Sequence, residues 1–304
     1  MDIELELKGK SIIGGIGDIK KKTIRFHSFR TGMENGQSMI YAIYEPSHPP
    51  KLFNGYSSGQ DLLVELTNLH IETYQLNEED AGEVIIGWCR THIFPYYNYG
   101  DLTVSIAKDN DPADSWDLLV NVVECYSFPV AKMRQNLKKL HRDMMSVFAV
   151  KSLLEGEYYQ AKCYLDAIVP KVDTQIIEGW QKSHKDRQLI WAEEFLNTNL
   201  PKFELKVEVN MSTGRLELAP EVKSVFDAAY YALARFVTVN SGALDDWGGK
   251  TNITFCQGCG RAFIKRGNRQ KYCSTPECQS IRNQRKSKDY YYREKQKEID
   301  DILS

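Results

Sequence analysis

Four of the seven cysteines lie within 23 residues, in two closely spaced pairs. Cys256 and Cys259 are separated by two residues, and Cys273 and Cys278 are separated by four. A structural zinc ion takes four such ligands in a tetrahedron, with zinc–sulfur distances of about 2.3 Å. We therefore expect the four cysteines to bind one structural zinc ion, with two disulfides or free thiols as the alternative.

A zinc ion with four thiolate ligands has no open position for a water molecule or a substrate. A catalytic zinc site keeps one position open and needs a general base nearby, whereas Glu277 is the one carboxylate between residues 256 and 288. No histidine follows His184, so we expect an all-cysteine ligand set. The pattern predicts a metal that stabilises a fold and takes no part in catalysis.

The residues around the cysteines predict a treble-clef-like finger. The two residues between Cys256 and Cys259 form a tight knuckle, and Gly260 suits the turn that follows. Ser274 and Glu277 match a capping box, so a helix should begin near the last cysteine and favour its thiolate. Because the segment is short and polar, metal binding should supply most of its folding free energy.

Basic side chains surround the cysteines and continue along the expected helix. Residues 256–288 hold nine Lys or Arg and a single acidic residue, a density typical of surfaces that bind nucleic-acid phosphates. A solvated basic helix, or one that docks on an acidic part of the same chain, is the alternative. The candidate nucleic-acid-binding residues are Arg261, Lys265, Arg266, Arg269, Lys271, Arg282, Arg285, Lys286, Lys288 and Arg293.

Three consecutive tyrosines, residues 290–292, follow the basic residues. Their rings can stack on unpaired bases or pack against the rest of the chain. Tyr292, Ile299 and Leu303 then lie near a seven-residue repeat. Contact with a second copy of the chain, giving a homodimer, and docking on the core of the same chain both remain open.

The charge distribution separates the two ends of the chain. Residues 251–304 carry a net charge of +6 and residues 1–250 carry −8, within a total of −2. This contrast predicts an acidic body and a basic end with a separate partner. No apolar run reaches the roughly 18–20 residues that span a membrane, and the first ten residues do not resemble a secretory signal. We expect a cytoplasmic protein with no membrane contact.

Hydrophobic patterning predicts an α+β fold with a mostly helical body, N-terminal β-strands and a late β-hairpin. We expect a mixed α/β to helical body in residues 1–200, a hairpin and helix in 201–250, and the finger with its basic C-terminal helix in 251–304. The strands are expected at 4–8, 23–29 and 39–44, and the hairpin at 203–209 and 214–218. The helices are expected at 78–93, from 115, and at 131–154, 158–168, 174–196 and 221–239.

The sequence of the body contains no catalytic motif. Its glycine-rich turn at residues 14–18 lacks the pattern of a phosphate-binding loop. Cys89, Cys125 and Cys163 are expected to behave as small apolar side chains. We therefore expect no enzyme, and a pocket gathering two histidines with an acid would change that view. The histidines, all isolated in sequence, are His27, His48, His70, His92, His141 and His184.

Residues 204–290 resemble the C-terminal part of the bacterial CGNR zinc-finger family, whereas residues 1–200 cannot be placed in that family's N-terminal domain. A hairpin and an alanine-rich helix at 228–234 precede the finger, as in that family. At Cys278 the chain reads Cys-Gln-Ser-Ile, with Arg282 one place later than in the family's signature tetrapeptide. The shared residues are the first cysteine pair, Phe263, Arg269, Tyr272, Cys273, Ser274, Cys278, Arg282 and the tail rich in Arg, Lys and Tyr.

The resemblance implies a bacterial transcription regulator that uses the finger on DNA. Together with the basic residues, it makes a nucleic-acid-binding protein with one structural zinc ion the leading hypothesis, with DNA favoured over RNA. The alternative is a zinc-stabilised module that binds a protein or RNA. An enzyme in the N-terminal body is the least favoured hypothesis, and the sequence does not identify any small-molecule ligand.

Overall fold

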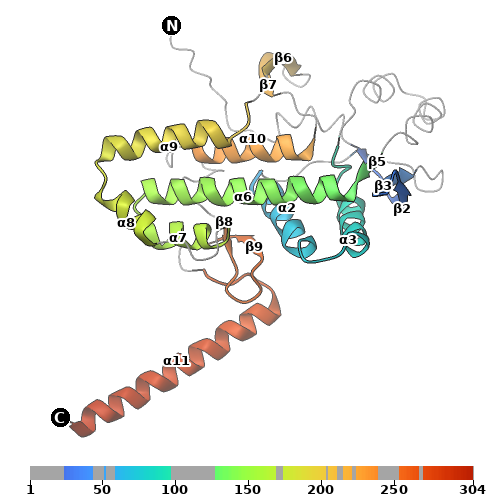
Figure 1. Ribbon diagram of the computed structural model, residues 1–304. Helices are drawn as coiled ribbons and strands as arrows, with labels where there is room; N and C mark the ends of the chain where they lie inside the picture. The colour runs from blue at the N-terminus through green and yellow to red at the C-terminus, as the bar shows by residue number, and fades with distance from the viewer. Residues whose placement is uncertain are drawn as a thin grey trace. The chain divides into compact units, whose positions relative to one another are not determined.

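The computed structural model describes ten stretches of the chain, which belong to two compact units, Met1–Lys250 and Thr251–Ser304 (Figure 1). The strand expected at 4–8 and the helix expected from 115 lie outside the described residues. The described residues are 24–43, 51–52, 59–96, 127–168, 174–202, 205–210, 215–220, 224–238, 253–266 and 270–303.

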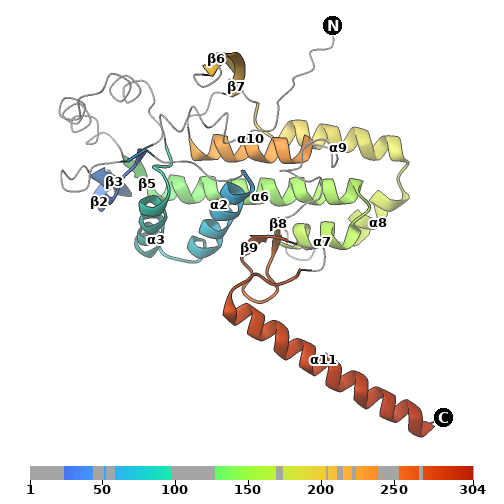
Figure 2. The ribbon, with the colours of Figure 1, turned by 180° about the vertical axis from the view of Figure 1, so that it is seen from behind.

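A long helix, α6 (Val130–Leu154), is the centre of the larger unit. Apolar side chains recur along it three or four residues apart and are buried, as a helix enclosed by neighbours requires. Figures 1 and 2 show the other helices on either side of it. Its helical neighbours are α2 (Gly59–Thr73), α3 (Glu78–Thr91), α7 (Tyr158–Asp166), α9 (Lys185–Asn199) and α10 (Val225–Thr238).

Two of these helices lie where the sequence places them. Helix α6 begins directly after Pro129, and α3 begins after Asn77, whose Oδ1 accepts a hydrogen bond of 2.9 Å from the backbone N–H of Asp80. Helix α2 is not among the helices expected from the sequence. Its buried leucines at 62, 63, 66 and 69 carry the helical period that predicts it.

The single helix expected at 174–196 is wrong, because the structure has α8 (Thr174–Lys182) and then α9. His184 precedes α9, and its Nδ1 accepts a hydrogen bond of 3.4 Å from the N–H of Asp186. The Gln188 amide donates to the carbonyl oxygen of Trp180 at 2.6 Å. These local side-chain bonds satisfy the backbone groups that a continuous helix would otherwise pair, and the chain turns there.

Helix α10 begins four residues later than the expected start at 221. Ser224 precedes it, and the Ser224 Oγ accepts a hydrogen bond of 3.2 Å from the N–H of Asp227. Pro220 is the last residue of strand β7 (Arg215–Pro220). That strand pairs antiparallel with β6 (Leu205–Asn210), which confirms the late hairpin.

The N-terminal strands form small antiparallel sheets. Strands β2 (Ser28–Glu34) and β3 (Gln37–Ile43) are joined by an Asn35-Gly36 turn in which both residues have positive φ, the usual hairpin connection. β3 also pairs with β5 (Ser127–Pro129), and β1 (Ile24–Arg25) pairs with β4 (Lys51–Leu52). The described fold is therefore mostly helical with small sheets, and the strand expected at 23–29 is split between β1 and β2.

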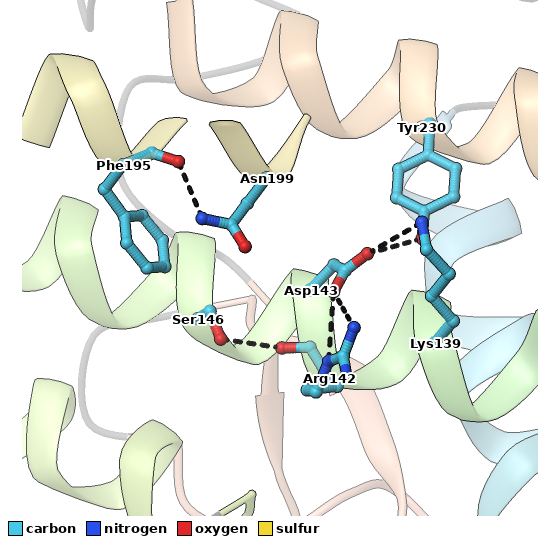
Figure 3. A network of polar contacts seen from close by, with 7 residues as sticks. All are labelled: Lys139, Arg142, Asp143, Ser146, Phe195, Asn199 and Tyr230. Carbon is cyan, nitrogen blue, oxygen red and sulfur yellow. Dashed lines mark hydrogen bonds and ion pairs between the residues drawn. The ribbon is translucent and has the colours of Figure 1, made fainter. Parts of the chain in front are cut away.

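A buried carboxylate joins α6 to α10 (Figure 3). Asp143 is 4% exposed, and its Oδ2 accepts a hydrogen bond of 2.7 Å from the hydroxyl of Tyr230. Lys139 Nζ lies 3.3 Å from the same oxygen, and Arg142 Nη2 lies 3.3 Å from Oδ1. The charge is therefore paired, as burial of a carboxylate requires, and the interaction fixes α10 against α6.

Tyr230→Phe removes the hydroxyl that donates to this carboxylate. Because a hydrogen bond to a charged group contributes about 1.5–3 kcal/mol, the free energy of unfolding of the larger unit should fall by about that amount. All five tryptophans lie within residues 1–250, so urea unfolding followed by tryptophan fluorescence reports on this unit. Tyr159→Phe is the matched control, because Tyr159 is 73% exposed. Equal stability of the two variants would contradict the assignment.

The pH dependence of stability in the wild type and in Tyr230→Phe gives a second test. Burial, and then the hydrogen bond to Asp143, raise the pKa of Tyr230 above its ordinary value of 10.0. A group whose pKa is raised by folding stabilises the folded state fully at pH values below its unfolded pKa. This stabilisation is lost as the pH rises above that value. The stability difference between wild type and Tyr230→Phe should be constant below pH 10.0 and shrink above it; a difference that widened would contradict this.

Candidate metal centre and its basic surroundings

The four cysteine sulfurs converge on one point. The Sγ atoms of Cys256, Cys259, Cys273 and Cys278 all lie within 4.8 Å of one another, and those of Cys259 and Cys273 are 3.9 Å apart. An ion bound at about 2.3 Å from each corner of a tetrahedron requires sulfur–sulfur separations of roughly 3.8 Å. The cluster therefore has the ligand number and spacing of a metal site. Among the described residues, no other group of three His, Cys, Asp or Glu side chains is placed to hold an ion.

The first cysteine pair lies in the turn of a short hairpin. Strands β8 (Ile253–Phe255) and β9 (Ala262–Ile264) pair antiparallel on either side of it. The N–H of Gly260 donates to the carbonyl oxygen of Cys256 at 2.8 Å, which closes the knuckle. Gly260 has φ +74°, a conformation that favours glycine, as the sequence predicts.

The second pair lies at the start of α11 (Pro276–Leu303). Proline is favoured at the first position of a helix, where its missing N–H has no partner to lose. The carbonyl oxygen of Thr275 accepts from the N–H of Gln279 at 3.0 Å, so Thr275 is the residue at the cap position. The capping box expected at Ser274 and Glu277 is therefore displaced, because the helix begins one residue later than that box requires.

Hydrogen bonds link the two pairs. The N–H of Cys273 and the N–H of Gly258 each donate to the Sγ of Cys256 at 3.3 Å. The N–H of Gln257 donates to the carbonyl oxygen of Lys271 at 2.9 Å. Backbone N–H groups aimed at a sulfur favour its thiolate, the form that binds a metal.

The cysteine pKa values show where negative charge is favoured in the cluster. Burial raises the pKa of Cys256, but the N–H groups of Cys273, Cys259 and Gly258 outweigh it and lower that pKa to about 6. At Cys278 a hydrogen bond with Thr275 lowers the pKa, while burial and the other three thiols raise it by more. Burial, and then the neighbouring sulfurs, therefore oppose a second thiolate at the helix start, where the sequence predicts one. A cation at the centre removes that opposition.

A small apolar cluster supports the sulfurs. Tyr272 is buried against Cys256 and Cys278, with Phe263 and Ile281 half-buried beside them. The hydroxyl of Tyr272 also accepts a hydrogen bond of 2.8 Å from Arg285 Nη1, whose guanidinium lies 5.7 Å from the ring centroid. The cluster is much smaller than the core of a domain that folds by apolar burial alone.

A second contact ties α11 to a cysteine of the cluster. The Gln279 Nε2 donates to the carbonyl oxygen of Cys273 at 2.6 Å, and the Gln279 Oε1 accepts from Arg282 Nη1 at 3.0 Å. The first turns of the helix are therefore fixed relative to the sulfurs through both Gln279 and Arg285.

The structure places eight of the ten basic residues predicted to bind nucleic acid on the surface of this unit. Lys265 is half-buried, and Arg269 lies outside the described residues. Five of the set share α11 and are exposed, although Arg285 is held by Tyr272. The exposed members are Arg261, Arg266, Lys271, Arg282, Arg285, Lys286, Lys288 and Arg293.

Two histidines that are isolated in sequence meet in the larger unit. The rings of His70 on α2 and His141 on α6 have centroids 4.7 Å apart. Burial, and then the charge of His70, lower the pKa of His141 to about 4. Burial is also the main cause of the lowered pKa of His70, followed by the charges of Lys138 and Arg134. With 70 residues between them, no sequence signal predicts this pair.

The cysteines outside the cluster differ in their burial. Cys89 is buried in α3, as expected, and burial raises the pKa of its thiol. Cys163 is exposed on α7, so the expectation that it packs as an apolar side chain is wrong. Cys125 lies outside the described residues.

Gly258 has no room for a side chain. A Cβ there would lie 3.0 Å from the Sγ and 3.3 Å from the Cβ of Cys278. Gly258→Ala should therefore displace a ligand and weaken metal binding by about tenfold or more, the effect typical of residues that position ligands. Cobalt(II) and zinc affinities measured by competition with a chromophoric chelator test this. Ser280→Ala, at an exposed position of α11, is the control, and equal affinities of the two variants would contradict the geometry.

The part of the chain that the structure describes contains no helix with the length and apolar character of a membrane span. No family model, curated protein or solved structure matches the chain. Its function must therefore be inferred from the cysteine cluster and from the charges around it.

Proposed function

We propose that this protein binds nucleic acid through residues 251–304 and that a single zinc ion, bound by the four cysteines, holds that unit in shape. The observation that carries the proposal is the set of exposed Lys and Arg side chains on a helix whose first turn contains one of the converging sulfurs. The finer assignment is a DNA-binding transcription regulator, and the resemblance of residues 204–290 to CGNR fingers supports it.

Zinc is the metal that the ligand set favours. Four thiolates in a tetrahedron suit zinc, and a site filled by four cysteines is structural. Zinc with four thiolates carries a charge of about −2, which the nearby cations offset. A hairpin knuckle followed by a helix that carries the last ligand supports a treble-clef-like arrangement.

The exposed cations are suited to phosphates. Residues 256–288 carry nine basic side chains against one acidic side chain, and the basic side chains described on α11 project from a rigid element. Most hydrogen bonds between proteins and DNA go to phosphate and sugar, and Arg and Lys make many of them. Each phosphate that is neutralised releases counterions, so binding of this kind weakens steeply as salt is added.

Salt dependence and charge reversal test the proposal. If six or more phosphates are contacted, raising the salt from 50 to 200 mM should weaken binding of fluorescein-labelled DNA at least about a hundredfold. The double variant Arg282→Glu, Lys286→Glu should abolish binding, because two attractive contacts become repulsive. Fluorescence anisotropy on single-stranded and duplex DNA measures both effects.

The control reverses two exposed charges of the larger unit, Lys182→Glu and Lys185→Glu. This variant should bind as the wild type does. Absence of DNA binding at low salt, or equal binding by the two double variants, would overturn the proposal. Tighter binding of an RNA strand of the same sequence would move the function from DNA to RNA.

A further inference from the structure

The exposed side chains of α11 divide into two faces with different surroundings. Successive residues of an α-helix are rotated by roughly 100°, so Arg282, Lys286, Tyr290 and Arg293 fall within an arc of about 80°. They form a single row about 16 Å long, because each residue adds about 1.5 Å along the axis. All four are exposed. We call these four residues the α11 row.

Side chains of α11 outside this arc make contacts within their own unit. Arg285 donates to Tyr272, and Lys288 Nζ lies 5.9 Å from the ring centroid of Tyr292. Tyr291 and Tyr292 contact each other edge to face, with centroids 5.9 Å apart. These two cations and two aromatic rings therefore have partners in the protein.

Tyr290 differs from its two neighbours. Its side chain is 66% exposed, and within the described residues it makes no hydrogen bond or ring contact. It follows Lys286 by one helical turn and precedes Arg293 by three residues, so a cation lies on each side of it along the row. An exposed aromatic ring between two cations has the arrangement of sites where a base stacks while its flanking phosphates are neutralised.

The start of the row is fixed to the cysteine cluster. Arg282 Nη1 donates to Gln279, and Gln279 donates to the carbonyl oxygen of the metal-ligand candidate Cys273. These two bonds orient the first cation of the row relative to the sulfurs. The rest of the row follows from the regular geometry of the helix.

We propose that the α11 row binds a single-stranded nucleic acid, with Arg282, Lys286 and Arg293 on phosphates and Tyr290 stacked on an unpaired base. The faces of bases are accessible to an aromatic side chain in a single strand and are covered by their neighbours in an intact duplex. Charge complementarity selects a polyanion as the occupant. This inference rests on the proposed function and specifies which form of nucleic acid the unit prefers.

The first test compares two exposed cations on opposite sides of α11. Arg293→Gln removes a cation of the row next to Tyr290, and Lys295→Gln removes a lysine that lies outside the set predicted to bind nucleic acid. Both variants lose one charge. Binding of fluorescein-labelled oligo(dT) to the zinc-loaded full chain should weaken about threefold or more for Arg293→Gln and change little for Lys295→Gln.

The salt dependence of the same titrations gives a second readout. Loss of one single-strand phosphate contact should reduce the slope of log affinity against log salt by about 0.7, and Lys295→Gln should keep the wild-type slope. Zinc content and helix content by circular dichroism establish that both variants are folded. Equal loss of affinity in the two variants would overturn the proposal.

The second test compares neighbouring tyrosines. Tyr290→Ala should weaken oligo(dT) binding about tenfold, within the range found for loss of one stacked base, whereas Tyr291→Ala should change it less than about twofold, because its ring has a partner in the protein. Tyr290→Phe keeps the ring and should bind as the wild type does. Annealing the strand to oligo(dA) should weaken binding and remove the effect of Tyr290→Ala.

The outcomes separate this inference from the proposed function. If the wild type binds neither single strand nor duplex, the proposed function fails. If the wild type binds and Tyr290→Ala matches Tyr291→Ala, or if the duplex binds more tightly than the strand, the function stands and the single-strand assignment fails.

Discussion

The constraint on which the C-terminal unit depends is the approach of four sulfur atoms to within 4.8 Å of one another. Backbone N–H groups favour a thiolate at Cys256, but its sulfur neighbours oppose further ionisation. A central cation would remove that repulsion and link two segments that only a short hairpin and a few backbone bonds otherwise connect. The apolar cluster around Tyr272 is too small to hold them alone. A metal bound here would therefore couple its own binding to the folding of the unit.

Fixing the sulfurs also fixes a helix that has little else to stabilise it. The described side chains of α11 beyond Ile281 are almost all polar or exposed, and a helix of that kind gains little from packing. Its first turn is held because Cys278 belongs to the cluster and because Gln279 and Arg285 bond to neighbours of the cluster. From that anchor the helical repeat alone decides which cations share a face. The metal would thus act at a distance, by setting the direction of residues that never touch it.

The sequence predicted the parts of this account that depend on local spacing. The cysteine pattern predicted the convergence of the sulfurs, and hydrophobic patterning predicted α3 and α6, because ligand spacing and the helical period both act over a few residues. Contacts between distant segments were not predictable. No pattern indicates that His70 meets His141, that Tyr230 donates to Asp143, or that Arg285, one of ten similar cations, is held by Tyr272. The break at His184 was missed although residues 181–188 contain no apolar side chain, because neither proline nor glycine marks it.

The central claim is that metal binding and nucleic-acid binding are one coupled property of residues 251–304. The most direct measurement is a zinc titration of the chelated, reduced full chain in the presence of labelled single-stranded DNA, with anisotropy and bound zinc followed together. The account predicts that DNA binding is absent without metal and rises in proportion to zinc, with saturation at one ion per chain. DNA binding of full strength in the metal-free protein, or saturation of zinc with no gain in DNA binding, would contradict it.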